Sequence, residues 1–126
     1  MNVHRTLLIA ILLAMCTGCD GGIWVHARIV DPAGKPIPGA TARLWFKGYQ
    51  DKFDGSSNGN GCIDLGGIIA PMREPWEVAI GAAGYKPLKT TVVSAERHTL
   101  LVTLQPVGSG EASGYKTTDR NEGCPP

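Results

Sequence analysis

The sequence has few of the features that mark several large classes of protein. Aromatic residues make up only 6% of its 126 residues, and its 12 Lys and Arg residues form no basic run and are balanced by 11 Asp and Glu. Nucleic-acid binding needs a concentrated basic surface, so no nucleic-acid partner is expected. The longest apolar run, residues 7–15, is too short to span a bilayer as a helix. The remaining chain shows no sustained helical period, which argues against a helical fold.

Glycine and proline are abundant instead, with 17 and 9 residues. This composition favours short elements joined by tight turns. Alternating and β-branched apolar residues predict strands, whereas residues 47–61 and 66–75 read as loops. The predicted strands cover residues 23–30, 39–46, 62–65, 76–80, 88–93 and 99–104. The length allows one domain, and the pattern is typical of an all-β sandwich.

The N-terminus has the parts of an export signal. Arg5 lies in a short polar segment, the apolar run follows, and Cys16-Thr17-Gly18-Cys19 comes next. The small residues before Cys19 resemble the lipobox of bacterial lipoproteins, although Cys16 stands where that family usually has Leu. The resemblance implies a signal peptide over residues 1–18, a lipid-bearing Cys19 and a tether over 19–22. Ordinary secretory cleavage near Gly18 is the alternative.

The same resemblance implies a place in the cell envelope. Cleavage after residue 18 leaves 11 basic and 11 acidic side chains, so membrane attachment would rest on acyl chains such as palmitate. Asp20 resembles the signal that retains lipoproteins of enteric bacteria in the inner membrane. It therefore favours the periplasmic face of the inner membrane.

Residues 29–40, Ile-Val-Asp-Pro-Ala-Gly-Lys-Pro-Ile-Pro-Gly-Ala, resemble the opening of carboxypeptidase-regulatory-like domains. Residues 57–63 resemble that family's Thr-Asp-x-x-Gly turn more loosely, and Gly84-Tyr85 its Gly-Tyr strand end. The resemblance covers residues 23–105 and implies a seven-stranded Greek-key β-sandwich of the transthyretin type. Residues 106–126 lack periodicity and are expected to be a flexible Gly/Ser-rich tail. Turn motifs identify a fold well and a function poorly.

Sequence motifs for catalysis are missing. No Gly-x-Ser-x-Gly elbow, His-Glu-x-x-His pair or phosphate loop occurs, so no enzymatic activity and no cofactor are expected. The alternative is a divergent transthyretin-like hydrolase using His26 and His98, although the C-terminal Tyr-Arg-Gly-Ser of such hydrolases is absent. Asp54, Ser56 and Asn58 resemble half of a calcium loop, but Leu65 stands where a bidentate Glu is needed, so no metal is expected.

One strand face combines an aromatic ring with polar groups. Trp24, His26 and Arg28 share a face of the first predicted strand, and Trp45 points outward from the next. Exposed aromatic residues on a sheet can bind a partner. The sequence thus predicts an interaction or structural module with an unidentified envelope protein or glycan partner. The alternative is a ligand- or glycan-binding module whose aromatic face is formed by Trp24 and Trp45.

Two cysteines remain once Cys16 is cleaved and Cys19 is acylated. Cys62 and Cys124 would then meet in an oxidising compartment, which favours a disulfide between them. The alternatives are a buried, reduced Cys62 and a Cys124 that is free or bonded between molecules.

Overall fold

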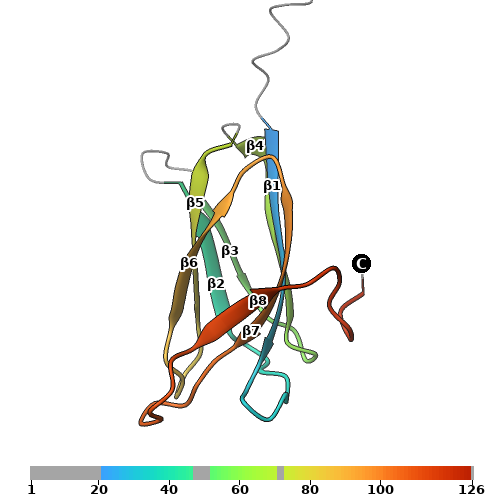
Figure 1. Ribbon diagram of the computed structural model, residues 1–126. Helices are drawn as coiled ribbons and strands as arrows, with labels where there is room; N and C mark the ends of the chain where they lie inside the picture. Colours follow the sequence, from blue (N-terminus) through green and yellow to red (C-terminus); the bar gives the residue numbers. More distant parts are fainter. Residues whose placement is uncertain (1–20, 47–51, 71–72, 126) are drawn as a thin grey trace, which may run out of the picture.

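The computed structural model describes residues 21–46, 52–70 and 73–125, which form two four-stranded sheets packed face to face (Figure 1). The first sheet has the strand order β4-β1-β7-β8 and the second β3-β2-β5-β6. The β1–β7 pair is parallel and the other pairs are antiparallel. The strands are β1 (Gly21–Val30), β2 (Thr41–Trp45), β3 (Lys52–Ser56), β4 (Cys62–Ala70), β5 (Pro75–Gly81), β6 (Leu88–Val93), β7 (Arg97–Thr103) and β8 (Gly114–Thr117).

The core lies between the sheets and follows the strand period of two, because successive side chains point to opposite faces. From β1, Ile23, Val25, Ala27 and Ile29 are buried, and every second residue of β5 and β7 meets them. Trp76 is the largest fully buried side chain, with the rings of Phe46 and Phe53 at centroid distances of 5.7 and 6.0 Å. The residues between these positions face outward.

Two predicted irregular stretches contain strands. β3 forms within the predicted loop 47–61, and β4 continues past the predicted end at residue 65. β3 carries few apolar residues because it is an edge strand with a half-exposed surface. Gly55 faces Leu65 and Ile63, whose side chains would lie 3.1 and 3.2 Å from a Cβ there, so this part of the core favours a residue without a side chain.

The predicted turn after β1 is confirmed. Asp31 Oδ1 accepts hydrogen bonds from the backbone N–H groups of Ala33 (2.9 Å) and Lys35 (2.8 Å). Gly34 between them has a φ of 83°, which favours glycine over residues with a side chain. The resemblance of residues 29–40 to a family of β-sandwiches therefore rested on turn chemistry that the structure contains.

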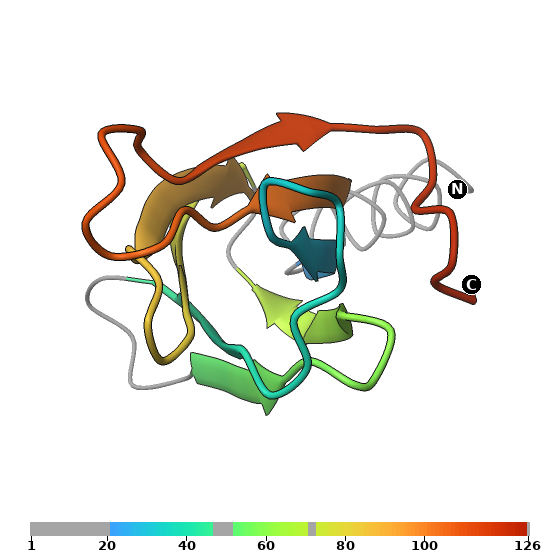
Figure 2. The same cartoon turned by 90° about the horizontal axis from the view of Figure 1, so that it is seen from below.

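The C-terminal region is not the structureless tail that the sequence predicts. Residues 114–117 form β8, which pairs with β7, so the described part of the domain has eight strands where seven were expected. The segment after β8 runs along one side of the sandwich (Figure 2). We call residues 118–125 the strap. Cys124 in the strap is bonded to Cys62 at the start of β4, with a Cα–Cα distance of 5.6 Å, which confirms the predicted disulfide.

The predicted signal peptide, Cys19 and Asp20 lie outside the described residues. Within the described ranges, no helix is long and apolar enough to cross a membrane.

Candidate binding groove

A groove of about 830 Å³ lies on the outer face of the first sheet. Three strands form its floor, namely β1, β4 and β7, and the strap forms one wall. We call it the strap groove. The polar groups that line it are His26, Asp64, Arg97, Thr99, Asp119, Arg120, Asn121 and Glu122. Its volume lies in the range of small-molecule sites, and its lining combines these polar groups with the Trp24 ring and the apolar residues Val25 and Leu65, which suits a ligand with both polar and apolar surface.

Trp24 provides the large aromatic surface of the groove. It lies between the buried residues Ile23 and Val25, so its ring points outward, and 39% of it is exposed. The ring lies over Gly22, because a Cβ at that position would overlap it. Arg97 is paired with Trp24 across β1 and β7, and its guanidinium carbon is 6.0 Å from the ring centroid. The absence of a side chain at Gly22 therefore allows the ring to lie in this position.

His26 lies two residues further along the same face of β1. Its strand neighbours are Asp64 on β4 and Thr99 on β7. The His26 imidazole donates a hydrogen bond through Nδ1 to the Asp64 carboxylate. This contact fixes the ring orientation and leaves Nε2 as the remaining polar atom of the imidazole. The pair joins a planar ring and a carboxylate in the middle of the groove.

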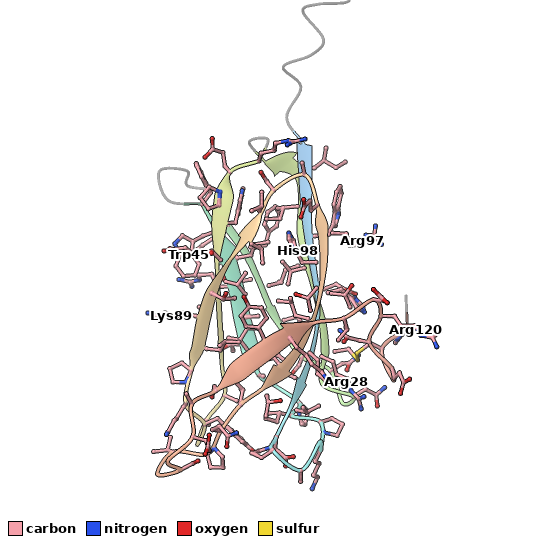
Figure 3. The ribbon with its side chains drawn as sticks, in the orientation of Figure 1. Arg28, Trp45, Lys89, Arg97, His98 and Arg120 are labelled. Atoms are coloured by element: carbon pink, nitrogen blue, oxygen red, sulfur yellow. A yellow bond between two sulfur atoms is a disulfide. The ribbon has the colours of Figure 1, made fainter. Side chains whose placement is uncertain are left out.

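The strap is tied to the sheet at four points, the first of which is the backbone bond from Thr118 N to Thr99 O at 2.9 Å. Asn121 is buried, and its Nδ2 donates to the backbone oxygens of Leu100 (3.0 Å) and His26 (3.3 Å). Arg28 Nη1 donates to the backbone oxygen of Glu122 at 2.7 Å. The Cys62–Cys124 bond closes the far end. The strap is therefore a fixed wall, and Arg97, Arg28 and Arg120 lie along this side of the molecule (Figure 3).

The predicted aromatic face does not exist as a single surface. Trp24 belongs to β1 in the first sheet, whereas Trp45 belongs to β2 in the second and lies on the opposite side of the sandwich from Arg97 (Figure 3). Both rings point outward, but from different sheets. Trp45 borders a separate trough of about 730 Å³ that contains an exposed ion pair, Arg43 Nε to Asp54 Oδ1 at 2.8 Å. Of the predicted face, Trp24 and His26 line the strap groove, and Arg28 holds the strap.

The structure also separates His26 from His98. His98 is paired with Val25, which is buried, so His98 faces the space between the sheets. Its Nε2 donates to the backbone oxygen of Val93 at 2.7 Å. His26 points to the outer face of the same sheet. The hypothesis of one catalytic site built from both imidazoles is therefore wrong.

The residues that resembled a calcium loop have other partners. Asp54 is ion-paired with Arg43, and Asn58 Oδ1 accepts from the N–H groups of Asn60 (2.9 Å) and Cys62 (3.0 Å). Across the described ranges, no group of three or more His, Cys, Asp or Glu side chains is placed to hold a metal ion.

No family model matches the chain, and no curated protein matches its sequence. Several solved structures resemble its fold. One is 5-hydroxyisourate hydrolase of Klebsiella pneumoniae, with a TM-score of 0.53 and 16% identity over 81% of this chain and 94% of that one. Catechol 1,2-dioxygenase of Pseudomonas arvilla has a TM-score of 0.54 and 13% identity, covering 75% of this chain. 3-Chlorocatechol 1,2-dioxygenase of Rhodococcus opacus has a TM-score of 0.52 and 14% identity, covering 71% of this chain. This chain spans 55% and 61% of the two dioxygenases.

These likenesses define the class of fold. The molecule is a transthyretin-like β-sandwich, as the sequence predicts, and identities this low establish the fold alone. The prediction that the chain is not an enzyme is overturned by the same neighbours, because all three are enzymes. Missing sequence motifs are therefore no ground for excluding catalysis on this sandwich.

Proposed function

We propose that this chain is a lipid-anchored binding module of the bacterial cell envelope and that its strap groove holds a sugar ring of an envelope glycan. The observation that carries the proposal is the exposed Trp24 ring in a groove that also contains the planar polar groups of His26, Asp64 and Arg97. The flat face of an indole stacks on the apolar face of a sugar ring, and planar polar groups at the ring edge bond its hydroxyls.

The charges in the groove favour an acidic sugar. The Arg97 guanidinium lies over the Trp24 ring, so a sugar that stacks on the indole displaces the guanidinium from the ring face and places its own substituents near it. A guanidinium recognises a carboxylate through two parallel hydrogen bonds. The Asp64 carboxylate accepts hydrogen bonds, which suits the hydroxyl or amide groups of the same ring. An amino sugar that carries a carboxylate, such as N-acetylmuramic acid of the cell wall, has all of these groups.

The sequence supports the anchoring part of the proposal. Residues 1–18 have the form of a lipoprotein signal peptide, Cys19 is the acylated residue, and Asp20 favours retention at the periplasmic face of the inner membrane. A groove ligand would then be met in the periplasm, where cell-wall glycan is present.

The test is an NMR titration of the chain from residue 19 onward with the N-acetylglucosamine–N-acetylmuramic acid disaccharide, which measures the affinity of binding. Trp24→Ala should weaken binding by about tenfold or more, because about 1.4 kcal/mol of stacking and burial is lost. Trp45→Ala is the matched control, since that ring lies on the other sheet. This variant should bind the disaccharide with the affinity of the wild type. Arg97→Gln should weaken binding of the disaccharide more than binding of chitobiose, which has no carboxylate.

Two results would contradict the proposal. If Trp45→Ala weakens binding and Trp24→Ala does not, the trough beside Arg43 and Asp54 is the site. If none of the variants changes a measurable affinity, the glycan contacts neither surface.

A further inference from the structure

One end of the sandwich is built around the start of β1. In Figure 1 this end includes the start of β1, the end of β4 and the turn between β6 and β7. Backbone hydrogen bonds join these segments: Ala95 N donates to Gly22 O at 2.7 Å, and Ser94 N donates to Glu74 O at 2.9 Å. Glu74 N in turn donates to Ser94 Oγ at 2.8 Å. The end is therefore a hydrogen-bonded cap and not a set of independent loops.

Only Asp20 separates Cys19 from the first residue of β1. Two Cα–Cα steps reach at most about 7 Å, whatever conformation they adopt. β1 itself is paired on both sides, with β4 and with β7. An acyl anchor on Cys19, which is part of the function proposed above, would therefore hold this end of the sandwich against the bilayer surface with almost no tether.

Exposed apolar side chains occur at this same end. Ile68 is 76% exposed and lies on β4 between the partners of Gly21 and Ile23. Val93, the last residue of β6, is 42% exposed and is paired with Pro75 at the start of β5. Among the residues that the structure describes, Ile68 is the most exposed large apolar side chain. A side chain of this kind fits a surface that contacts an apolar medium.

Charges at this end are mixed. Arg73, Lys52 and Arg97 are exposed basic residues, and Glu74 and Glu96 are exposed acidic residues nearby. Attraction of net charge to anionic lipid is therefore small, so apolar contact has to supply the interaction. Long basic side chains such as Arg73 can extend to phosphate groups while their methylene stems lie in the interface.

We propose that Ile68 and Val93 form a bilayer-contacting rim, which holds the sandwich upright on the membrane that carries the Cys19 lipid. Its occupant is the phospholipid headgroup region of that membrane. Trp24 lies three residues after the start of β1, so it is about 17 Å or less from Cys19 along the chain. The strap groove then opens close to the membrane surface, so its ligand has to be accessible there.

The test uses single cysteines in the mature, acylated chain. Cys19 carries lipid and Cys62 is bonded to Cys124, so an introduced cysteine is the free thiol available for labelling. Ile68→Cys and Val93→Cys report on the rim. Val107→Cys is the matched control, because Val107 is also apolar and 69% exposed but follows β7, at the other end of the sandwich. Each variant carries an environment-sensitive fluorophore and is reconstituted in vesicles of phosphatidylethanolamine and phosphatidylglycerol.

Contact with the bilayer should shift the emission of the labels at residues 68 and 93 to the blue, and nitroxide lipids in the vesicles should quench them. The label at residue 107 should show neither effect. Equal quenching at 68 and 107 would overturn the proposal, because the sandwich would then have no preferred orientation. Quenching at 107 alone would overturn it as well. The intact mass of the chain reports acylation separately. A measured mass without acyl groups would show that Cys19 carries no lipid, and this would overturn the proposal. The glycan titration, made in solution, is unaffected by that result.

Discussion

Reduction of the Cys62–Cys124 bond should destabilise the domain by a large fraction of its total stability. The two cysteines are separated by 62 positions, so the bond closes a loop that includes β4 to β8. In the chain-entropy model, a loop of this length stabilises the folded state by about 4 kcal/mol at 25 °C, because it restricts the unfolded chain. A domain of this size has a free energy of unfolding of about 5–15 kcal/mol.

The measurement is urea unfolding followed by circular dichroism, with and without a thiol reductant. With an m value of about 1.5 kcal/mol/M, a loss of 4 kcal/mol lowers the midpoint by about 2 to 3 M. The double variant Cys62→Ala/Cys124→Ala is the control, because it should start from the lower midpoint and not respond to the reductant. An unchanged midpoint after complete reduction of the wild type would refute the reasoning. A shift in the double variant would mean that the reductant acts elsewhere.

Two further predictions concern backbone conformation and the strap. Ala95 has a φ of 66°, so Ala95→Gly should raise the free energy of unfolding by about 0.5–1 kcal/mol. Gly84 has a φ of 83° and a Cβ there would meet open space, so Gly84→Ala should lower the free energy of unfolding by a similar amount. If thermal or urea unfolding shows that both variants change the stability in the same direction, the strain argument is contradicted. Asn121→Ala should destabilise the chain by about 1–3 kcal/mol, because the oxygens of His26 and Leu100 lose a buried donor. Hydrogen exchange should then increase across the strap, and unchanged exchange there would show that Asn121 does not hold it.

The elements that the sequence predicts correctly are those with strong local signals. The apolar alternation in β1, β5 and β7 is nearly unbroken, and Asp31 and Gly34 mark the turn after β1 through their own backbone chemistry. Such signals depend on neighbours in the chain, which is why they can be read without a structure. The outward direction of Trp24 follows from the same alternation.

The elements that the sequence misses depend on distant partners. β3 and β8 are edge strands whose residues, such as Asp54 and Lys116, are polar on at least one face. Their stability comes from pairing with β2 and β7, and no local pattern records that pairing. The error over Trp24 and Trp45 has the same origin, because alternation gives the face of a strand but not the sheet to which the strand belongs.

The strap groove shows how much of a site can depend on partners outside the regular strands. Asp64 and Arg97 reach it because β4 and β7 flank β1, and the strap residues reach it because Cys124 is held at Cys62. Without the disulfide, the remaining ties are the Thr118–Thr99 backbone bond and the Asn121 and Arg28 hydrogen bonds, each of which contributes at most about 3 kcal/mol against the entropy of the released segment. An oxidising compartment, in which the disulfide forms, therefore favours a fixed wall, and this is the compartment to which the N-terminal signal would direct the chain. The proposed export and the proposed binding site are thus linked: in a reducing cytoplasm the chain would hold the wall of its groove by hydrogen bonds alone.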